Sequence, residues 1–215
     1  MSMICSALAI DGSTLLQLRQ DEDLTLGVTS LAYGRMREHQ FEQHMQELSE
    51  GERSAARQRW KQAQAASRER MPKEYAAQMA EMDALEARAA SLNLRGAMSL
   101  EKSWDALHHL FELAGGSIFD GEPLGSDQGY GPAVLRTPAN VTEFSNFLNG
   151  PGATQIKHAD MMWLREQRVY AWPEPDDATV SDEEMREHLN RYFETFRAYV
   201  TDAAARGDAM LIWIS

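Results

Sequence analysis

Apolar residues form unbroken runs at both ends of the 215-residue chain. Residues 3–10 read Met-Ile-Cys-Ser-Ala-Leu-Ala-Ile, and residues 209–214 read Ala-Met-Leu-Ile-Trp-Ile. Runs of this length without regularly alternating polar positions are typical of strands that are buried on both faces. We therefore expect two strands at the centre of a sheet, with the last strand beside the first.

The clearest helix precedes the last strand. Ser181-Asp182-Glu183-Glu184 has the S-x-x-E pattern of a capping box, in which the Ser and Glu side chains satisfy free amides at the start of a helix. Apolar side chains then recur at helical spacing until Gly207, a residue suited to the end of a helix. These apolar positions are Met185, Leu189, Tyr192, Phe193, Phe196, Tyr199, Val200 and Ala203.

Shorter patterns predict the other elements outside residues 35–91. Ser13 is expected to cap a helix over 14–20, and Thr137 with Pro138 to open another helix that Gly150 ends. The Gly- and Pro-rich stretch 119–138 predicts a loop. The remaining expectations are a short strand over 92–95, a helix from Trp104 to Gly115, a helix over 154–167 and an extended segment over 169–173.

Residues 35–91 have a different composition, dominated by Arg, Glu, Gln, Ala and Met with one proline and one glycine. This composition predicts long helices, and Pro72 should end the first of them because it forces the preceding residue out of the helical region. We expect two antiparallel helices, with an irregularity near Gly51. This hairpin either packs on its own domain or offers a surface to a partner helix or a second copy.

Together these elements predict an α+β fold, sandwich-like, with a small mixed central sheet flanked by helices. The chain should form a single domain over residues 1–215, with residues 35–91 as a helical hairpin inserted within it. The shortened flanks are expected to fold without the hairpin, because neither terminal strand depends on it for backbone pairing.

Net charge is −12 and is unevenly distributed. The hairpin holds ten basic and ten acidic residues, so the rest of the chain, with 11 basic and 23 acidic residues, carries the whole imbalance. An acidic surface repels a polyphosphate backbone, which disfavours nucleic acid and favours a basic protein or cationic ligand. The alternative is that the acidity only keeps the protein in solution.

The single cysteine, Cys5, cannot form an internal disulfide and is expected to be a buried, inert thiol. No apolar run approaches the roughly 18 residues that a membrane span needs, and no signal-peptide pattern opens the chain. We expect a cytoplasmic protein, a monomer or homodimer, without contact to a membrane.

Candidate chemistry centres on the helix that begins at Trp104. His108 follows Asp105 by three residues, and the Gly-Pro loop after Tyr130 could return that phenol to the same helix. Trp104, Asp105, His108 and Tyr130 are therefore the residues expected to line a pocket, if one exists. The alternative is a buried imidazole bonded to backbone, with Asp105 paired locally. No nucleophile, phosphate-binding or metal motif occurs, and His158 with Asp160 makes an incomplete ligand set, so no metal or cofactor is expected.

Several pieces resemble the YfbM-like family, a bacterial family of unknown function. They are the N-terminal Met-x-Met-Ile-Cys, Leu-Glu-Lys-Ser-Trp-Asp-Ala-Leu-His over 100–108, Tyr-Gly-Pro-Ala over 130–133, residues 170–173 and the closing helix and strand. The resemblance covers residues 1–30 and 92–215, and 35–91 looks like an insertion. Family members continue Tyr-Gly-Pro-Ala with an arginine, where this chain has Val134 and places Arg136 two residues later. The resemblance implies an α/β sandwich-like fold around a small sheet and supplies no activity.

Two functions follow from these observations. The first is a non-catalytic acidic binding protein, most concretely an immunity protein or inhibitor that neutralises a basic bacterial toxin by covering its active site. The second is a small-molecule enzyme or ligand-binding domain with its pocket at the Trp104 helix. The partner surface expected under the first function comprises Phe41, Met45, Trp60, Glu174, Asp176 and Asp177.

Overall fold

The computed structural model describes residues 3–46, 48–69, 75–170, 172–173 and 179–215. Its strands form one sheet with the order β2-β1-β5-β4-β3. The pairings between these five strands are antiparallel, so the α+β class is confirmed and the expectation of a mixed sheet is wrong. The strands are β1 (Cys5–Ile10), β2 (Met98–Glu101), β3 (Glu122–Leu124), β4 (Ala133–Arg136) and β5 (Ala209–Ile214).

The two terminal runs form the centre of this sheet, as predicted. Cys5 pairs with Ile214 and Ile10 with Ala209, so β1 and β5 are in register over their full length. Side chains alternate between the two faces of a strand. Ala7 and Ala9 therefore belong to one hydrophobic core, whereas Leu8 and Ile10 belong to another on the opposite face. Burial on both faces explains why these strands are apolar at every position except Ser6.

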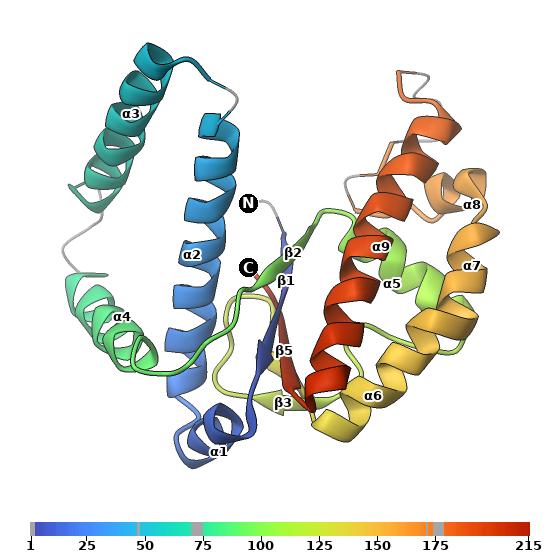
Figure 1. Cartoon of the computed structure of the whole chain (residues 1–215), viewed down its shortest axis with the longest axis horizontal. Helices are drawn as coiled ribbons and strands as arrows, with labels where there is room; N and C mark the ends of the chain where they lie inside the picture. Colours follow the sequence, from blue (N-terminus) through green and yellow to red (C-terminus); the bar gives the residue numbers. More distant parts are fainter. Residues whose placement is uncertain (1–2, 47, 70–74, 171, 174–178) are drawn as a thin grey trace.

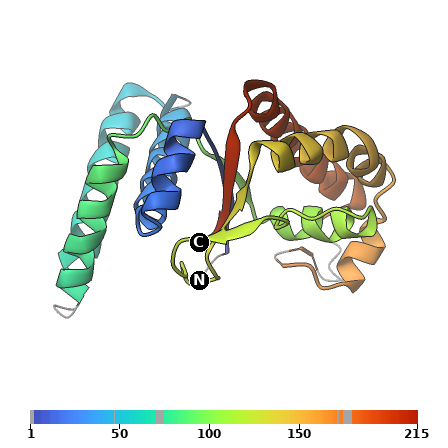
Figure 2. The ribbon, with the colours of Figure 1, turned by 90° about the horizontal axis from the view of Figure 1, so that it is seen from below.

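A helical layer covers each face of the sheet (Figures 1 and 2). The C-terminal layer surrounds Phe111, Phe144, Phe193 and Phe196, whose rings meet edge to face at 5.8–6.3 Å between centroids. Edge-to-face contacts of this kind stabilise a core beyond the area they bury. The layer contains α5 (Trp104–Leu113), α6 (Pro138–Phe147), the π-helical turn η2 (Leu148–Gly152), α7 (Ala153–Lys157), α8 (Met161–Glu166) and α9 (Asp182–Arg206).

Helix α9 has the ends that its sequence predicts. The Ser181 and Glu184 side chains form the reciprocal capping box, and Gly207 ends the helix with a left-handed φ of 71°. The single helix expected over 154–167 is instead divided into α7 and α8. Asp160 is responsible for the division, because its carboxylate accepts hydrogen bonds from the amides of Met162 and Trp163 and so caps α8.

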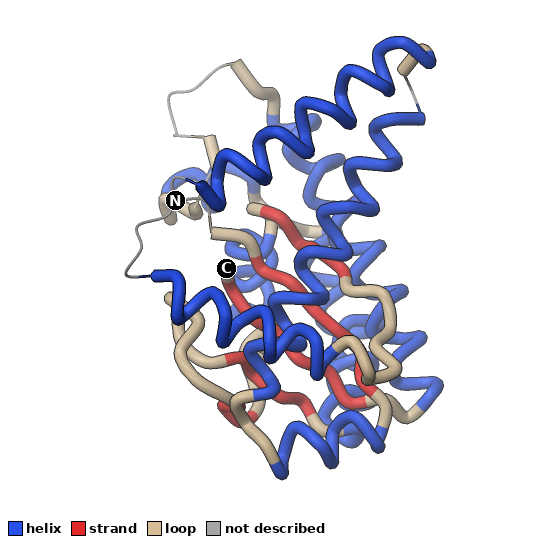
Figure 3. The backbone as a smooth tube through the Cα atoms, turned by 90° about the vertical axis from the view of Figure 1, so that its left-hand side faces the viewer, coloured by secondary structure: helices blue, strands red, loops and turns tan. Residues whose placement is uncertain are grey.

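The N-terminal layer contains α1 (Gly12–Gln20), α2 (Leu24–Gln46), α3 (Glu50–Glu69) and α4 (Ala76–Ala89). Figure 3 views this layer from outside, with the strands behind its helices. Val28 and Ala32 bury the first turns of α2 against the sheet. α4 packs on α2 so closely that a Cβ at Gly27 would lie 2.5 Å from the Leu85 carbonyl oxygen. The glycine is what permits this approach of two backbones.

The hairpin expected over 35–91 needs correction at both ends. α2 begins 11 residues earlier, at Leu24, and the end of α4 belongs to the core because Ala89 is fully buried. Residues 35–91 also contain three helical segments rather than two. Only α3 has no buried residue among its described side chains. It contacts α2 through the stacked rings of Phe41 and Trp60, whose centroids are 4.7 Å apart, and through an ion pair between Arg57 and Glu42.

The connections contain further differences from expectation. Asp11 rather than Ser13 caps α1, because its carboxylate accepts from the Thr14 amide. Residues 92–95 contain no strand, and β2 begins only at Met98. The stretch 119–138, expected to be loop, contributes β3 and β4. Both strands are short, and their Gly- and Pro-rich surroundings concealed them.

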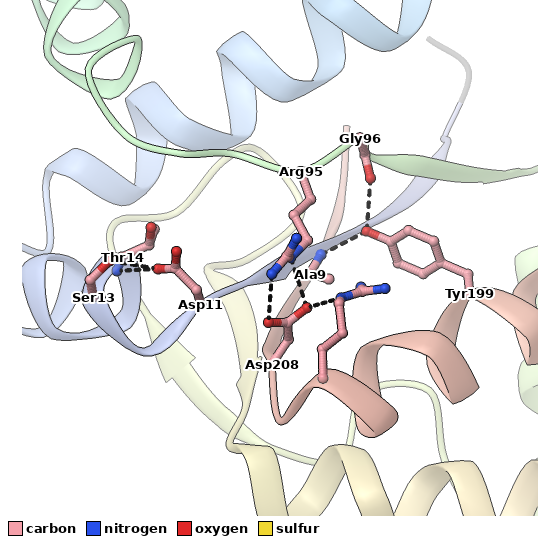
Figure 4. A network of polar contacts seen from close by, with 9 residues as sticks. Ala9, Asp11, Ser13, Thr14, Arg95, Gly96, Tyr199 and Asp208 are labelled. Atoms are coloured by element: carbon pink, nitrogen blue, oxygen red, sulfur yellow. Dashed lines mark hydrogen bonds and ion pairs between the residues drawn. The ribbon is translucent and has the colours of Figure 1, made fainter.

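A polar network fixes the connection between α4 and β2 to the end of the sheet (Figure 4). The carboxylate of Asp208, only 3% exposed, lies 2.9 Å from Arg95 Nε and 2.7 Å from Arg206 Nε. The Tyr199 hydroxyl accepts from the Ala9 amide at 2.7 Å and donates to the Gly96 carbonyl at 2.9 Å. Burial raises the pKa of Tyr199 to about 12. This network ties α9, β1 and the 93–97 connection together.

Candidate functional site at the start of helix α5

Three of the four residues expected to line a pocket lie on α5, and each has a local structural role. Trp104 is 8% exposed and packs its ring edge to face with Phe119. Asp105 accepts a hydrogen bond of 2.7 Å from the Tyr170 amide. His108 is half-buried against Phe119, and its Nε2 lies 3.4 Å from Glu112. Burial lowers the pKa of His108, so its ring is neutral at pH 7.

Tyr130 is not brought to this helix. Its loop lies on the opposite side of the sheet, where Gln128 accepts a hydrogen bond from Thr29 of α2. Gly125 at the start of the same loop likewise approaches Thr25 of α2. β3 and β4, which the sequence did not reveal, direct the loop to the N-terminal layer. The predicted four-residue pocket is therefore wrong in including Tyr130, which is 43% exposed and lies on the other side of the sheet from His108.

Of the residues expected to form a partner surface, the structure describes Phe41, Met45 and Trp60. Met45 is 1% exposed, so its inclusion in a surface is wrong. Phe41 and Trp60 stack on each other in the N-terminal layer. Glu174, Asp176 and Asp177 lie outside the described residues.

The described residues enclose a cavity of about 340 Å³ beside the start of α5. Its walls come from four parts of the chain: residues 102–103 just before α5, residues 172–173, residues 179–180 just before α9, and the first two turns of α9. The volume is at the lower end of the roughly 300–1,000 Å³ found for ligand pockets. The lining residues are Lys102, Ser103, Trp172, Pro173, Thr179, Val180, Glu184, Met185 and His188.

A serine and a histidine meet in the wall of this cavity. Ser103 Oγ lies 2.9 Å from His188 Nε2, and the other ring nitrogen, Nδ1, lies 3.1 Å from Arg191 Nη2. A guanidinium can only donate, so Nδ1 must be the acceptor and the neutral ring carries its proton on Nε2. His188 therefore donates to the Ser103 oxygen. Burial and then the charge of Arg191 lower the pKa of His188, which keeps the ring neutral.

The direction of the hydrogen bond between His188 and Ser103 determines the chemistry that Ser103 can perform. A serine nucleophile needs a histidine that accepts its proton, with the far ring nitrogen bonded to a carboxylate. Here the far nitrogen faces a cation, and the serine receives a hydrogen bond instead of giving one. The hydroxyl proton of Ser103 has no acceptor among the described residues. Ser103 thus presents a hydrogen-bond donor at the cavity.

Two opposite charges complete the cavity lining. Lys102 adjoins Ser103, and Glu184 lies on α9 one turn before His188. One oxygen of Glu184 accepts from both the amide and the hydroxyl of Ser181, and these bonds lower the pKa of the carboxyl. Glu184 is therefore ionised at neutral pH. The other lining residues are largely apolar: Trp172, Pro173, Thr179, Val180 and Met185.

The exposed side of the same helix start is acidic. Asp182, Glu183, Glu184 and Glu187 are all exposed on the first two turns of α9. Two arginines lie nearby. Arg186 donates to the Ala159 carbonyl at 3.0 Å, whereas Arg165 donates to the Val180 carbonyl at 2.8 Å and also to the Asp182 carboxylate at 3.4 Å. Asp182 is thus paired, whereas Glu183, Glu184 and Glu187 form no ion pair with the described residues, so most of the negative charge of these two turns is uncompensated.

Neither metal ligation nor a membrane span is found in the described part of the chain. No group of three or more His, Cys, Asp or Glu side chains could hold a metal ion there. Asp160 caps α8, which accounts for the Asp of the His158 and Asp160 pair. No described helix is both long enough and apolar enough to cross a membrane.

The sequence pointed to the helix beside this cavity, but none of the four residues predicted for the pocket lines the cavity, and the pair that meets there was missed. Ser103 and His188 are 85 residues apart, and no motif joins them. The signal that was present is the position of Ser103 directly before Trp104, where a serine would ordinarily cap its own helix. Its side chain makes no such capping bond, since its backbone is helical (φ −72°, ψ −11°) rather than extended, and its hydroxyl contacts His188.

The fold and the site define an α+β protein with an antiparallel sheet between two helical layers and a small polar cavity at one helix start. The chain belongs to the family described as "Domain of unknown function (DUF1877)", whose model matches residues 1–213. It is also similar to a solved structure, the protein of unknown function YfbM from Escherichia coli. That similarity amounts to 15% identity and a TM-score of 0.49, and covers 99% of each chain. No curated protein matches the chain.

Proposed function

We propose that this protein is a non-catalytic binding protein whose acidic surface at the start of α9 recognises a basic protein partner. The observation that carries the proposal is the set of exposed carboxylates on residues 182–187, held in place by the capping box. A rigid helix loses little conformational freedom on binding, so its charges are well suited to recognition. Complementary charge also speeds the encounter with a basic partner.

The sequence around this helix start strengthens the proposal. Residues 174–187 contain seven acidic residues and one arginine, Arg186, a net charge of −6 within 14 residues. Arg186 is bonded to the Ala159 carbonyl and so points away from the exposed carboxylates. The hydrogen bond from His188 to Ser103 supports a binding role rather than a hydrolytic one, since a histidine that donates to a serine cannot activate it as a nucleophile.

A basic toxin is the most concrete partner class, with this chain as the inhibitor that covers its active site. A cytoplasmic setting belongs to the same proposal, because inhibitors of this kind act where the toxin acts. Cys5 fits that setting: it is a free, fully buried thiol whose pKa burial raises above its ordinary value, so it resists oxidation.

The test uses the tagged full chain as bait in extracts of its native cells at low salt. Glu183→Lys with Glu187→Lys should abolish capture of a basic protein. Glu38→Lys with Glu81→Lys changes net charge equally on the N-terminal layer, at two exposed positions, and should leave capture intact. Equal capture by both double variants would contradict the proposed surface.

The inhibitor role has its own readout. The captured protein, expressed alone in a host cell, should arrest growth, and co-expression of this chain should restore it. The Glu183 and Glu187 double variant should fail to restore growth while remaining folded by circular dichroism. A captured protein that is harmless alone would contradict the toxin-inhibitor role and leave binding as the function.

A further inference from the structure

We propose that the cavity between α5 and α9 is a binding site for a small zwitterion with an apolar side chain, of the size of an α-amino acid. The site shares Glu184 with the exposed acidic surface, but its other ligand contacts come from Lys102, Ser103 and the apolar wall, so the inference does not depend on a protein partner. It rests on the charges, donors and spacing of the side chains that line the cavity.

The charge of the lining selects the ligand class. Lys102 contributes one positive charge and Glu184 one negative charge, and His188 is neutral because partial burial and then the charge of Arg191 lower its pKa. A purely anionic ligand would be repelled by Glu184, and a purely cationic one by Lys102. A ligand with both charges satisfies each of them.

The donors fix the orientation of the ligand. Ser103 is 2% exposed, and its hydroxyl proton has no acceptor among the described residues because His188 already donates to the oxygen. A buried donor without an acceptor costs free energy, which a carboxylate in the cavity would recover. The ligand's carboxylate therefore binds at Ser103 and Lys102.

The ammonium group then faces Glu184. Glu184 and His188 are four residues apart on α9, which places them about 6 Å apart along the helix axis on one face. The His188 ring contacts Ser103, so the anionic and cationic anchors of the ligand lie about one helical turn apart. That spacing suits an α-amino acid hydrogen-bonded at both ends. Trp172, Val180 and Met185 offer the apolar wall for its side chain.

The experiment uses calorimetric titration of the full chain with three probes that share a phenyl ring. L-Phenylalanine carries both charges, 2-phenylethylamine lacks the carboxylate and 3-phenylpropanoate lacks the ammonium. L-Phenylalanine should bind about tenfold or more tightly than either single-charge probe, because each of those probes lacks one charge-assisted hydrogen bond.

Two variants identify the anchors. Lys102→Met should weaken the binding of L-phenylalanine and 3-phenylpropanoate but not that of 2-phenylethylamine, which Lys102 repels. Glu184→Gln should do the reverse, and glutamine preserves the capping box that α9 needs. Binding should also shift the ¹⁵N signals of the His188 ring, which reports on the cavity itself. Absence of L-phenylalanine binding at millimolar concentration, or equal affinity for all three probes, would overturn the proposal.

Discussion

Gly27 and Gly34 lie on the same helix, α2, in opposite environments, and replacing each by alanine should change stability in opposite directions. A Cβ at Gly27 would lie 2.5 Å from the Leu85 carbonyl oxygen, 2.6 Å from its carbon and 2.8 Å from its Cβ. At Gly34 nothing lies within 4 Å. The pair therefore tests whether α4 packs on α2 as part of the body.

The magnitudes follow from two opposing effects. Alanine favours a helix interior over glycine by about 0.8–1.0 kcal/mol, a gain available at both positions. At Gly27 the clash involves backbone atoms of α4, so the helices must separate, and overpacking of this kind costs about 1–3 kcal/mol. Gly34→Ala should raise the free energy of unfolding by about 0.5–1 kcal/mol. Gly27→Ala should lower it by about 0.5–2 kcal/mol.

Urea unfolding monitored by circular dichroism measures both values against the unmodified chain. In a chain of this length 1 kcal/mol corresponds to about 2–4 °C, so the two variants should also differ in Tm by several degrees. Equal stabilisation by both substitutions would refute the packing of α4 against α2. It would also restore the simpler picture of residues 35–91 as an independent appendage.

Two further predictions concern the core and the polar network. Phe196→Ala should lower the free energy of unfolding by about 3–5 kcal/mol, since Phe196 is fully buried. Trp60→Ala should lower it much less, because the Trp60 ring stacks on Phe41 at the boundary of α2 and α3. Equal losses in urea unfolding would place α3 in the core. Tyr199, with its pKa raised to about 12 from about 10, stabilises the fold below pH 10, and this stability is lost as the pH rises toward 12. Tyr199→Phe should therefore be less stable than the unmodified chain at pH 8. Between pH 9 and 11 the variant should lose less stability than the unmodified chain loses. Parallel stability curves of the two proteins over this pH range would contradict the raised pKa of Tyr199.

The sequence predicted those elements whose signals are local. Residues 5–10 and 209–214 are apolar because both of their faces are buried, and α9 has a capping box and a terminal glycine that need no tertiary information. The short strands β3 and β4 escaped prediction because a three- or four-residue strand is defined by its partner rather than by its own pattern. The predicted start of the hairpin was wrong for a similar reason. The composition of the chain changes at residue 35, but α2 runs through this position without a break from the buried turns that pack on the sheet.

The candidate site was predictable only in part. The spacing along α5 identified the helix, and burial then assigned Trp104 and His108 to its inner side. The contact between Ser103 and His188 joins two elements 85 residues apart, and Tyr130 was misplaced because its route depends on the unpredicted strand pair. Contacts of this kind depend on tertiary packing, which a single sequence does not specify residue by residue.

The most direct test of the proposed function is site-specific photo-crosslinking in the native cells from position 187, with position 38 as the matched control. Both side chains are exposed glutamates, one at the acidic start of α9 and one on α2 in the opposite layer. Mass spectrometry of the adducts should identify one basic protein linked from position 187 and absent from position 38. Adducts from position 38 alone, or no protein adduct from position 187, would contradict recognition of a basic partner by the start of α9.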